Sequence, residues 1–407
     1  MRLGETMVKY DFNKVISRKN TNCAKWDAAE FIFGEKDVLP MWVADMDIPI
    51  AKPITEALRE RTKHEFYGYT LSEPFSTIIA ITDRMKRKYN WIVRPEWIVI
   101  TPGIVPALFN AVKAFTEPGD AVIHQDPIYY PFWGAIESNG CRVANNPLKL
   151  ENSRYGIDFE DLASKFKPVF RMRPFPSRVK MMLLCNPHNP VGRVWTREEL
   201  TRMGSIVVEN NAIMISDEIH CELLFKGYEH IPFATLSKEF EQNSVTCIAP
   251  SKTFNLAGLG ASAIIIPNKK LRNQFNQAKI GIMPSANIFG LTALEAAYNH
   301  GDEWLEQFLR HMQDNLDFLI HYFENHIPRI KVIKPEGTYL VWLDCRELGM
   351  KEEELAEFMN KKAKVGLDHG YAFGPGGRGF ERINIACPRK LLEEGLKRIK
   401  TAIAELE

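Results

Sequence analysis

The chain has 407 residues, 45% of them hydrophobic, and its 52 Lys and Arg against 51 Asp and Glu give a formal net charge of +1. This length exceeds the roughly 250 to 300 residues that one hydrophobic core supports, so two domains are expected. The balanced charge argues against nucleic acid as the main partner, no long apolar run suggests a membrane span, and seven dispersed Cys without an export signal indicate a reducing cytoplasm.

The first candidate site lies between a predicted strand at 98–100 and a predicted helix at 105–115. The turn between them begins Thr101-Pro-Gly and leads into the helix start, where backbone N–H groups lack partners within the helix. Such groups bind anions, so Gly103 and Ile104 are candidate contacts for a phosphate. The alternative for Gly103 is an ordinary turn glycine.

Apolar runs at 121–124 and 181–185 predict two further buried strands. The second run is followed by Asn-Pro-His-Asn-Pro-Val-Gly at 186–192. Proline and glycine cannot continue the strand, so the polar side chains lie in a loop at its end. There Asn189 is placed to donate its amide to a phenolate oxygen, although Asn-Pro pairs also mark ordinary turns.

An amphipathic stretch at 197–210 precedes an apolar run at 212–216, and Asp217 follows that run. Ligands of open α/β sheets bind at the carboxyl ends of the strands. Asp217 is therefore a candidate partner for a pyridinium nitrogen, because a buried carboxylate keeps such a nitrogen charged and makes its ring an electron sink. The alternative is a helix or turn cap after a strand.

Lys252 follows the apolar run 245–249 and precedes a loop, which places its amine to bond covalently with a carbonyl cofactor. The alternative is a solvated surface lysine. Because Asn189, Asp217 and Lys252 each follow a strand, the three groups converge on one sheet edge. The alternation of strands and helices predicts a mostly parallel sheet with helices on both faces.

The C-terminal part of the chain has a different pattern, which predicts a small α+β domain. A proline-free helix at 302–327 is placed to link this domain to the preceding one. The predicted strands of the small domain lie near 338–342 and 383–386, and its predicted helices lie near 352–363 and 390–406.

Three segments carry a resemblance to a known family: 185–192, Ser-Asp-Glu-Ile-His at 216–220, and Ser-Lys-Thr-Phe-Asn-Leu-Ala-Gly at 251–258. Their order and separations resemble those of class I/II aminotransferases, which are fold-type I enzymes that depend on pyridoxal 5'-phosphate (PLP). The resemblance extends from 39–49 to 382–386, which is nearly the whole chain.

The resemblance implies an α/β fold of the fold-type I PLP-dependent transferases. A large domain, with a mostly parallel seven-stranded sheet between helices, is accompanied by a smaller α+β domain. The implied division is an N-terminal segment at 1–60 that packs with the small domain, the PLP-binding domain at 61–300, and the linking helix with the small domain at 301–407.

The resemblance also implies how the cofactor is held. Lys252 would bind PLP covalently, and Asp217 would pair with its ring nitrogen. Asn189 and His220 would flank the phenolic oxygen. Tyr129 matches the aromatic side chain that stacks on the ring, with the adjacent Tyr130 as the alternative.

The phosphate and the substrate have their own implied contacts. Gly103, Ile104 and Ser251 would contact the phosphate, and Tyr69 resembles a tyrosine that reaches the phosphate of the neighbouring subunit. Arg382 matches the arginine that binds the substrate α-carboxylate, together with Asn189. The alternative for Arg382 is a salt bridge at a strand end.

Within the family, Met-Trp-Val-Ala-Asp-Met-Asp at 41–47, Arg-Val-Trp at 193–195 and Asp-Glu-Ile-His most resemble the cysteine-S-conjugate β-lyase (cystathionine β-lyase) branch. The resemblance implies a homodimer with shared active sites that cleaves cystathionine or other cysteine S-conjugates to thiol, pyruvate and ammonia. An aminotransferase is the nearest alternative, and a PLP-binding regulatory protein with incidental lyase activity is another. No metal is expected, because no Cys-x-x-Cys or His-Glu-x-x-His motif occurs.

Overall fold

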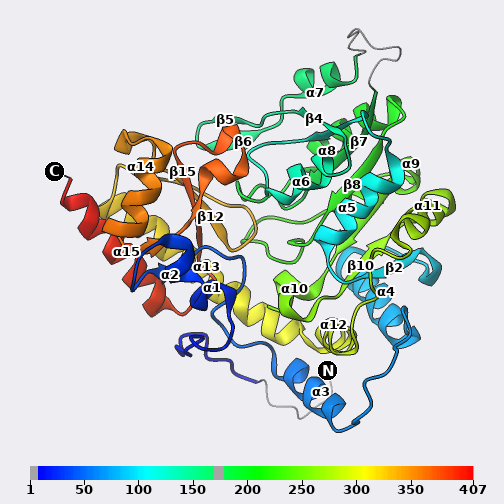
Figure 1. Ribbon diagram of the computed structural model, residues 1–407, viewed down its shortest axis with the longest axis horizontal. Coiled ribbons are helices and arrows are strands. Elements are labelled where there is room, and N and C mark those ends of the chain that lie inside the picture. Colours follow the sequence, from blue (N-terminus) through cyan, green and yellow to red (C-terminus); the bar gives the residue numbers. More distant parts are fainter. Residues whose placement is uncertain (1–7, 168–177, 407) are drawn as a thin grey trace.

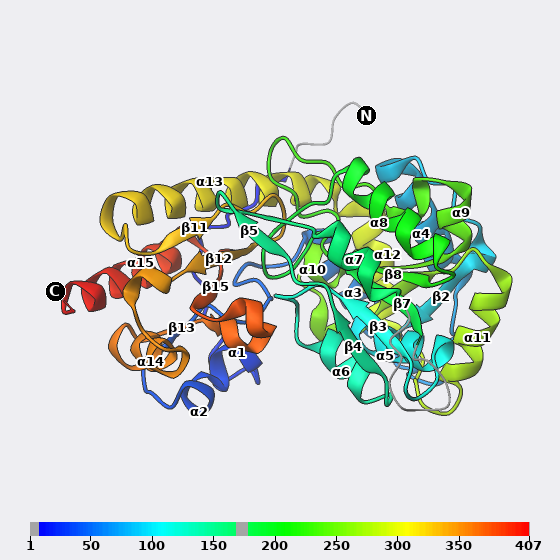
Figure 2. The ribbon, with the colours of Figure 1, turned by 90° about the horizontal axis from the view of Figure 1, so that it is seen from above.

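The computed structural model describes residues 8–167 and 178–406. They form a large and a smaller domain, joined by one long helix (Figure 1 and Figure 2). The large domain contains a seven-stranded sheet in the order β2-β10-β9-β8-β7-β3-β4. Neighbouring strands from β9 to β4 are parallel, whereas β10 is antiparallel to both of its neighbours. The fold is therefore α/β with a mostly parallel sheet.

Five strands of this sheet coincide with the predicted apolar runs to within two residues. The pattern does not predict β4, a partly exposed edge strand, or β10, which follows a glycine-rich turn at 258–260. The bounds are Ile98–Thr101 (β2), Ala121–His124 (β3), Arg142–Asn145 (β4), Val179–Cys185 (β7), Ile213–Asp217 (β8), Ser244–Ile248 (β9) and Ser262–Ile265 (β10).

Helices cover both faces of the sheet, and strand β7 shows why. Met181 and Leu183 enter the core beneath one helical layer, whereas Met182 and Leu184 enter the core beneath the other. Because side chains alternate along a strand, a strand that is covered on both faces is apolar throughout. The first layer comprises α5 (Ile104–Phe115), α6 (Pro131–Glu137) and α11 (Lys269–Lys279), and the second comprises α7 (Phe159–Lys165), α8 (Arg197–Glu209) and α9 (Lys238–Gln242).

Further helices of the large domain pack around α12 (Ile288–His300), namely α3 (Lys52–Thr62), α4 (Phe75–Tyr89) and α10 (Pro250–Thr253). Residues 52–60, which the sequence assigned to the segment beside the small domain, thus lie against the large domain. The physical reason is that α3 buries Ile54, next to the buried Ala51.

Helix α13 (Asp302–His326) runs from the large domain along the small one (Figure 2). The small domain has an antiparallel sheet in the order β11-β12-β15-β14. Strand β12 begins at Leu340, two residues later than predicted, because Thr338 has a φ of 69° and its Oγ1 accepts a bond from the Leu340 N–H. The bounds are Lys331–Ile333 (β11), Leu340–Asp344 (β12), Asp368–His369 (β14), Phe380–Asn384 (β15), Glu352–Glu357 (α14) and Arg389–Ala404 (α15).

The N-terminal segment packs on this small domain through a short parallel pairing of Leu39 with Val365. The backbone oxygen of Met41 then accepts a hydrogen bond of 2.9 Å from the backbone N–H of Asn384.

The helix predicted to reach residue 363 ends its α-helical part at Glu357 and continues as a π-helix. The remaining bounds are α1 (Ala24–Asp27), α2 (Ala29–Phe33), β1 (Leu39–Pro40), β5 (Lys149–Glu151), β6 (Arg154–Gly156), β13 (Val365–Gly366), η1 (Pro95–Trp97), η2 (Phe233–Thr235), η3 (Ala257–Leu259), η4 (Arg346–Leu348), η5 (Phe358–Lys362), η6 (Gly370–Phe373) and η7 (Pro375–Gly377).

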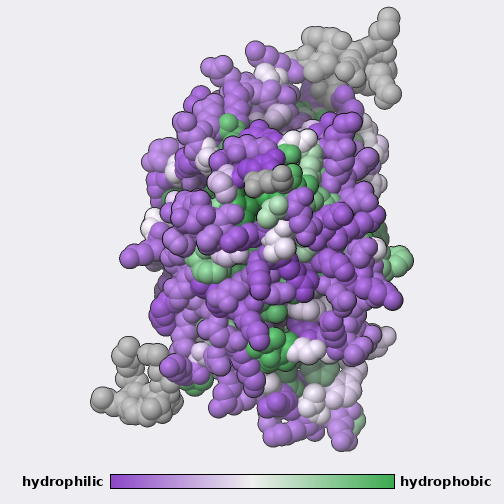
Figure 3. Space-filling model, turned by 90° about the vertical axis from the view of Figure 1, so that its left-hand side faces the viewer, coloured by the Kyte–Doolittle hydropathy of each residue, from purple (hydrophilic) through white to green (hydrophobic). Residues whose placement is uncertain are grey.

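Two kinds of feature are absent from the described part of the chain. Within residues 8–167 and 178–406, no helix combines the length and the apolar character needed to cross a bilayer. The same residues contain no cluster of three or more His, Cys, Asp or Glu side chains arranged to hold a metal ion. The face of the small domain shown in Figure 3 is mainly hydrophilic, with scattered apolar side chains.

Candidate active site

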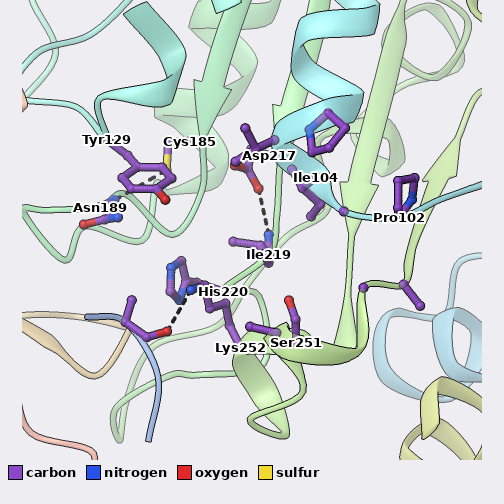
Figure 4. Close-up of a pocket in the computed structure, with 17 residues that line it drawn as sticks. Pro102, Ile104, Tyr129, Cys185, Asn189, Asp217, Ile219, His220, Ser251 and Lys252 are labelled. Atoms are coloured by element: carbon purple, nitrogen blue, oxygen red, sulfur yellow. Dashed lines mark hydrogen bonds between the residues drawn. The ribbon is translucent and has the colours of Figure 1, made fainter. Parts of the chain in front are cut away.

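A cavity of about 200 Å³ lies at the carboxyl ends of the parallel strands. Its walls come from the start of α5 and from the segments that follow β3, β7, β8 and β9 (Figure 4). Eight of the ten residues singled out by the sequence line this cavity: Gly103, Ile104, Tyr129, Asn189, Asp217, His220, Ser251 and Lys252.

Lys252 lies on α10, the single helical turn that follows β9. Its Nζ donates a hydrogen bond of 2.7 Å to the backbone oxygen of Ala44. Burial, with a smaller effect from the positive charge of Arg382, lowers the pKa of Lys252 to about 8. The amine is therefore neutral in a larger fraction of molecules than a surface lysine, as a nucleophile or general base must be. Lys252 is therefore not a solvated surface lysine, which was the alternative interpretation.

Asp217 is the last residue of β8 and is 6% exposed. It lies across the cavity from Lys252 (Figure 4). Its Oδ1 accepts a bond of 3.1 Å from the Ile219 N–H, which is the turn contact that the capping alternative describes. Burial raises the pKa of Asp217 to about 7. A cationic nitrogen beside this carboxyl would stabilise its ionised form, so the site suits a protonated ring nitrogen.

His220 and Tyr129 complete the walls next to Asn189. His220 is 3% exposed, and its Nδ1 has no hydrogen-bond partner among the described residues. A buried polar atom without a protein partner is uncommon and indicates a place for a ligand atom. Tyr129 lines the cavity, whereas Tyr130 is 49% exposed and is not part of the lining.

The start of α5 forms the end of the cavity near Ser251. Gly103 is the N-cap of α5, and Ile104 is its first residue. This helix has twelve residues and no acidic residue in its first turn, so its N–H groups and dipole remain available to an anion. A phosphate group has the charge and the acceptor atoms that these donors require.

Arg382 lies next to the cavity on β15 and is 2% exposed. Its Nη1 donates a bond of 2.9 Å to Asn189 Oδ1, and its Nη2 donates one of 3.1 Å to the Trp42 oxygen. It also forms an ion pair with Asp368. The salt-bridge alternative is therefore present in the structure, and Arg382 also contacts Asn189, the other residue that the resemblance assigns to carboxylate binding.

Tyr69 is the candidate that the structure does not bring to the cavity of its own chain. Its side chain is fully exposed, and it does not line the cavity. It precedes α4 in a segment without helix or strand.

Three residues of the site were not singled out by the sequence. The Ala44 oxygen accepts the Lys252 bond, the Tyr339 hydroxyl donates to the same oxygen at 2.9 Å, and Cys185 pairs in register with Asp217 across β7 and β8. Ala44 contributes a backbone atom, which no side-chain pattern reveals. Tyr339 is contributed by the small domain, so its position depends on how the domains pack.

A sequence model described as Aminotransferase class I and II matches residues 37–399. The chain belongs to this family. It is 44% identical to Cystathionine beta-lyase PatB of Bacillus subtilis (strain 168), over 97% of this chain and 100% of that protein. It also resembles the solved structure of cystalysin from Treponema denticola, which contains PLP, with 38% identity, 98% and 100% coverage and a TM-score of 0.93. The PLP-bound C-S lyase of Staphylococcus hominis is 34% identical, with 97% and 98% coverage and a TM-score of 0.89.

Proposed function

We propose that this protein is a PLP-dependent C-S β-lyase that cleaves cystathionine or other cysteine S-conjugates to a thiol, pyruvate and ammonia. The observation that carries the proposal is the placement of the Lys252 amine and the Asp217 carboxyl across one cavity that opens onto a helix N-terminus. The lyase reaction is chosen over transamination because PatB and the C-S lyase of S. hominis are 44% and 34% identical to this chain, whereas Arginine--pyruvate transaminase AruH of Pseudomonas aeruginosa is 27% identical over a similar length.

The residues present fit PLP group by group. Lys252 suits its carbonyl carbon, Asp217 its ring nitrogen, and the start of α5 with Ser251 its phosphate. His220, whose Nδ1 has no partner among the described residues, and Asn189 both line the cavity and would suit the phenolic oxygen. Tyr129 provides an aromatic face for stacking. When bound, PLP accepts the electron pair that remains on the substrate α-carbon after proton loss.

The protein's own groups then bind the substrate and move its proton. Arg382 and Asn189 bind the α-carboxylate, because a guanidinium offers two parallel donors to a carboxylate. The neutral Lys252 amine removes the proton from the α-carbon. Asp217, in its ionised form, would maintain the positive charge on the ring nitrogen of the bound cofactor.

The overall reaction balances with water as the second reactant. The α-proton and the thiolate leave the cysteine conjugate, the thiolate is released as thiol, and hydrolysis of the remaining three-carbon unit gives pyruvate and ammonia. No keto acid takes part, whereas an aminotransferase requires one to accept the amino group.

Pyruvate should therefore appear when the purified, PLP-loaded enzyme is mixed with cystathionine alone. Its formation can be followed with a lactate dehydrogenase coupled assay, and the thiol with a thiol reagent in equal amount. A parallel reaction with an added keto acid serves as the control. If cystathionine and S-alkyl cysteines release no pyruvate and turnover depends on the keto acid, the protein is an aminotransferase instead. Negligible turnover under all these conditions would support the regulatory alternative.

We also infer that the active unit is a homodimer. Tyr69 belongs to an exposed apolar surface, and such a surface commonly marks a protein interface. A hydrogen bond of 3.2 Å between Ser72 and Ser285 joins the two segments that form it. The exposed apolar side chains of the two segments are Phe66, Tyr67, Tyr69, Leu71, Phe75, Ile280 and Ile282. A two-fold dimer would bury this surface and bring Tyr69 to the phosphate of the neighbouring site.

Mixing two impaired variants tests the shared site. Tyr69→Phe subunits retain Lys252 and Lys252→Ala subunits retain Tyr69, so a mixed dimer contains one site with both residues. Activity should return on mixing, after each variant alone has been shown to be impaired and subunit exchange has been confirmed. A fully active monomer in size-exclusion chromatography, or confirmed mixed dimers without activity, would contradict the shared site.

The cysteines support a reducing compartment, and we place the enzyme in the cytoplasm. All seven are free thiols, and six of them are buried. Disulfides form and persist mainly in oxidising compartments, so a chain with this many unpaired cysteines fits the cytoplasm better.

A further inference from the structure

The backbone oxygen of Ala44 accepts two hydrogen bonds from different parts of the fold. Lys252 Nζ donates one at 2.7 Å (Figure 4), and the Tyr339 hydroxyl donates the other at 2.9 Å. A carbonyl oxygen has two lone pairs. Because Tyr339 occupies one of them, a single acceptor direction is left for the Lys252 amine.

Tyr339 and the backbone segment that carries the Ala44 oxygen are each held in place by the surrounding fold. Tyr339 is completely buried, and its ring meets that of His220 edge-on at 6.1 Å. Its backbone oxygen accepts a bond of 2.9 Å from the Ile385 N–H. The segment that carries Ala44 is fixed by Asn384, whose Nδ2 donates bonds of 2.6 Å to the backbone oxygens on both sides of Ala44.

We propose that Tyr339 is a positioning residue for Lys252, acting through the Ala44 carbonyl to hold the free amine in one orientation while it removes the α-proton. The placement matters because proton transfer requires the donor and acceptor atoms to be aligned, and a displacement of roughly 1 Å can cost a factor of about 10² in rate. This inference rests on the proposed PLP-dependent role of Lys252, but it does not require that a thioether be cleaved.

The test compares Tyr339→Phe with Tyr155→Phe, each as the PLP-loaded enzyme. Tyr155 is a matched control, because it is also buried (3% exposed) and its hydroxyl accepts a bond of 3.2 Å from Trp342 Nε1. Exchange of the α-proton of L-alanine in deuterated water, followed by NMR, measures proton removal without a leaving group. Tyr339→Phe keeps the ring that packs on His220, so the folded state and the visible absorbance of the bound cofactor should match those of the parent enzyme.

Exchange should slow by about 10-fold or more in Tyr339→Phe and remain near the parent rate in Tyr155→Phe. The acidic limb of the exchange rate against pH should also move to higher pH in Tyr339→Phe. The reason is that the Ala44 oxygen then offers both lone pairs to the Lys252 ammonium, and bonds to a charged form favour it.

Four results would overturn the proposal, and a fifth would contradict only the lyase function. Slowing of less than about 10-fold in Tyr339→Phe, an unmoved acidic limb, or equal slowing in both variants would show that the Tyr339 hydroxyl does not position Lys252. Absence of exchange in the parent enzyme would remove the role of Lys252 itself, and the proposal with it. Normal exchange without pyruvate release would instead contradict the lyase function alone.

Discussion

Replacing Lys252 with alanine should abolish the covalent bond to PLP and lower turnover by at least ~10³-fold, because one amine supplies both the cofactor linkage and the general base. The Lys252 amine lies in the cavity and has a pKa of about 8. We expect no other lysine to take over its role. The parent enzyme should be yellow after purification. In the variant, the bound cofactor should be released by dialysis or denaturation without reduction, and borohydride should not fix it to the chain.

The control for this experiment is Lys270→Ala, which removes an exposed lysine on α11. That variant should keep both the colour and the parent rate. A Lys252→Ala enzyme with full activity would exclude Lys252 as the cofactor lysine. Mass spectrometry of a borohydride-treated digest locates the modified peptide independently of activity.

Asp217→Asn should slow α-proton removal by ~10²-fold or more, since each factor of ten corresponds to about 1.4 kcal/mol of transition-state stabilisation. Asparagine preserves the shape of the side chain but carries no charge with which to keep the ring nitrogen protonated. Burial raises the pKa of Asp217 to about 7 although the charge of Lys252 lowers it, and a further cation at the carboxyl itself would favour the ionised form. The same alanine exchange assay and pyruvate release both measure the effect.

Two variants separate charge from packing at this position. Asp217→Glu keeps the charge and should retain more activity than Asp217→Asn. Glu218→Gln changes the neighbouring buried carboxyl, which bonds to Ser216 and His230 rather than lining the cavity, and should also retain more activity. If Asp217→Asn turns over as fast as the parent enzyme, the ring nitrogen does not depend on Asp217.

Local sequence determines the strands that carry the site. A strand covered on both faces must be apolar along its length, so β7, β8 and β9 are visible as continuous runs, and the polar residue after each run falls at the carboxyl edge of the sheet. For this reason the sequence predicts that Asn189, Asp217 and Lys252 lie at one edge of the sheet. The start of α5 could be predicted for a similar local reason, because a turn that contains glycine precedes an apolar helix.

The boundaries of helices and strands in the small domain were harder to predict, because the pattern of side chains does not determine the local backbone conformation. The positive φ of Thr338 delays β12, and a π-helical turn ends α14 early, although the apolar pattern continues through both places. In the N-terminal segment, α3 packs on α12 and contributes Ile54 to the same hydrophobic core, and a composition pattern alone does not say which partner a helix chooses.

The fold class, the strand ends and the side chains that converge on them follow from periodicity and turn chemistry between near neighbours in the chain, so they can be predicted from the residues. What surrounds Lys252 depends on tertiary packing. Its amine meets the Ala44 oxygen across 208 positions of sequence, and that oxygen meets Tyr339 across 295. The physical reason is that these contacts depend on how two domains and the N-terminal segment pack, and a backbone carbonyl leaves no mark in the residue pattern.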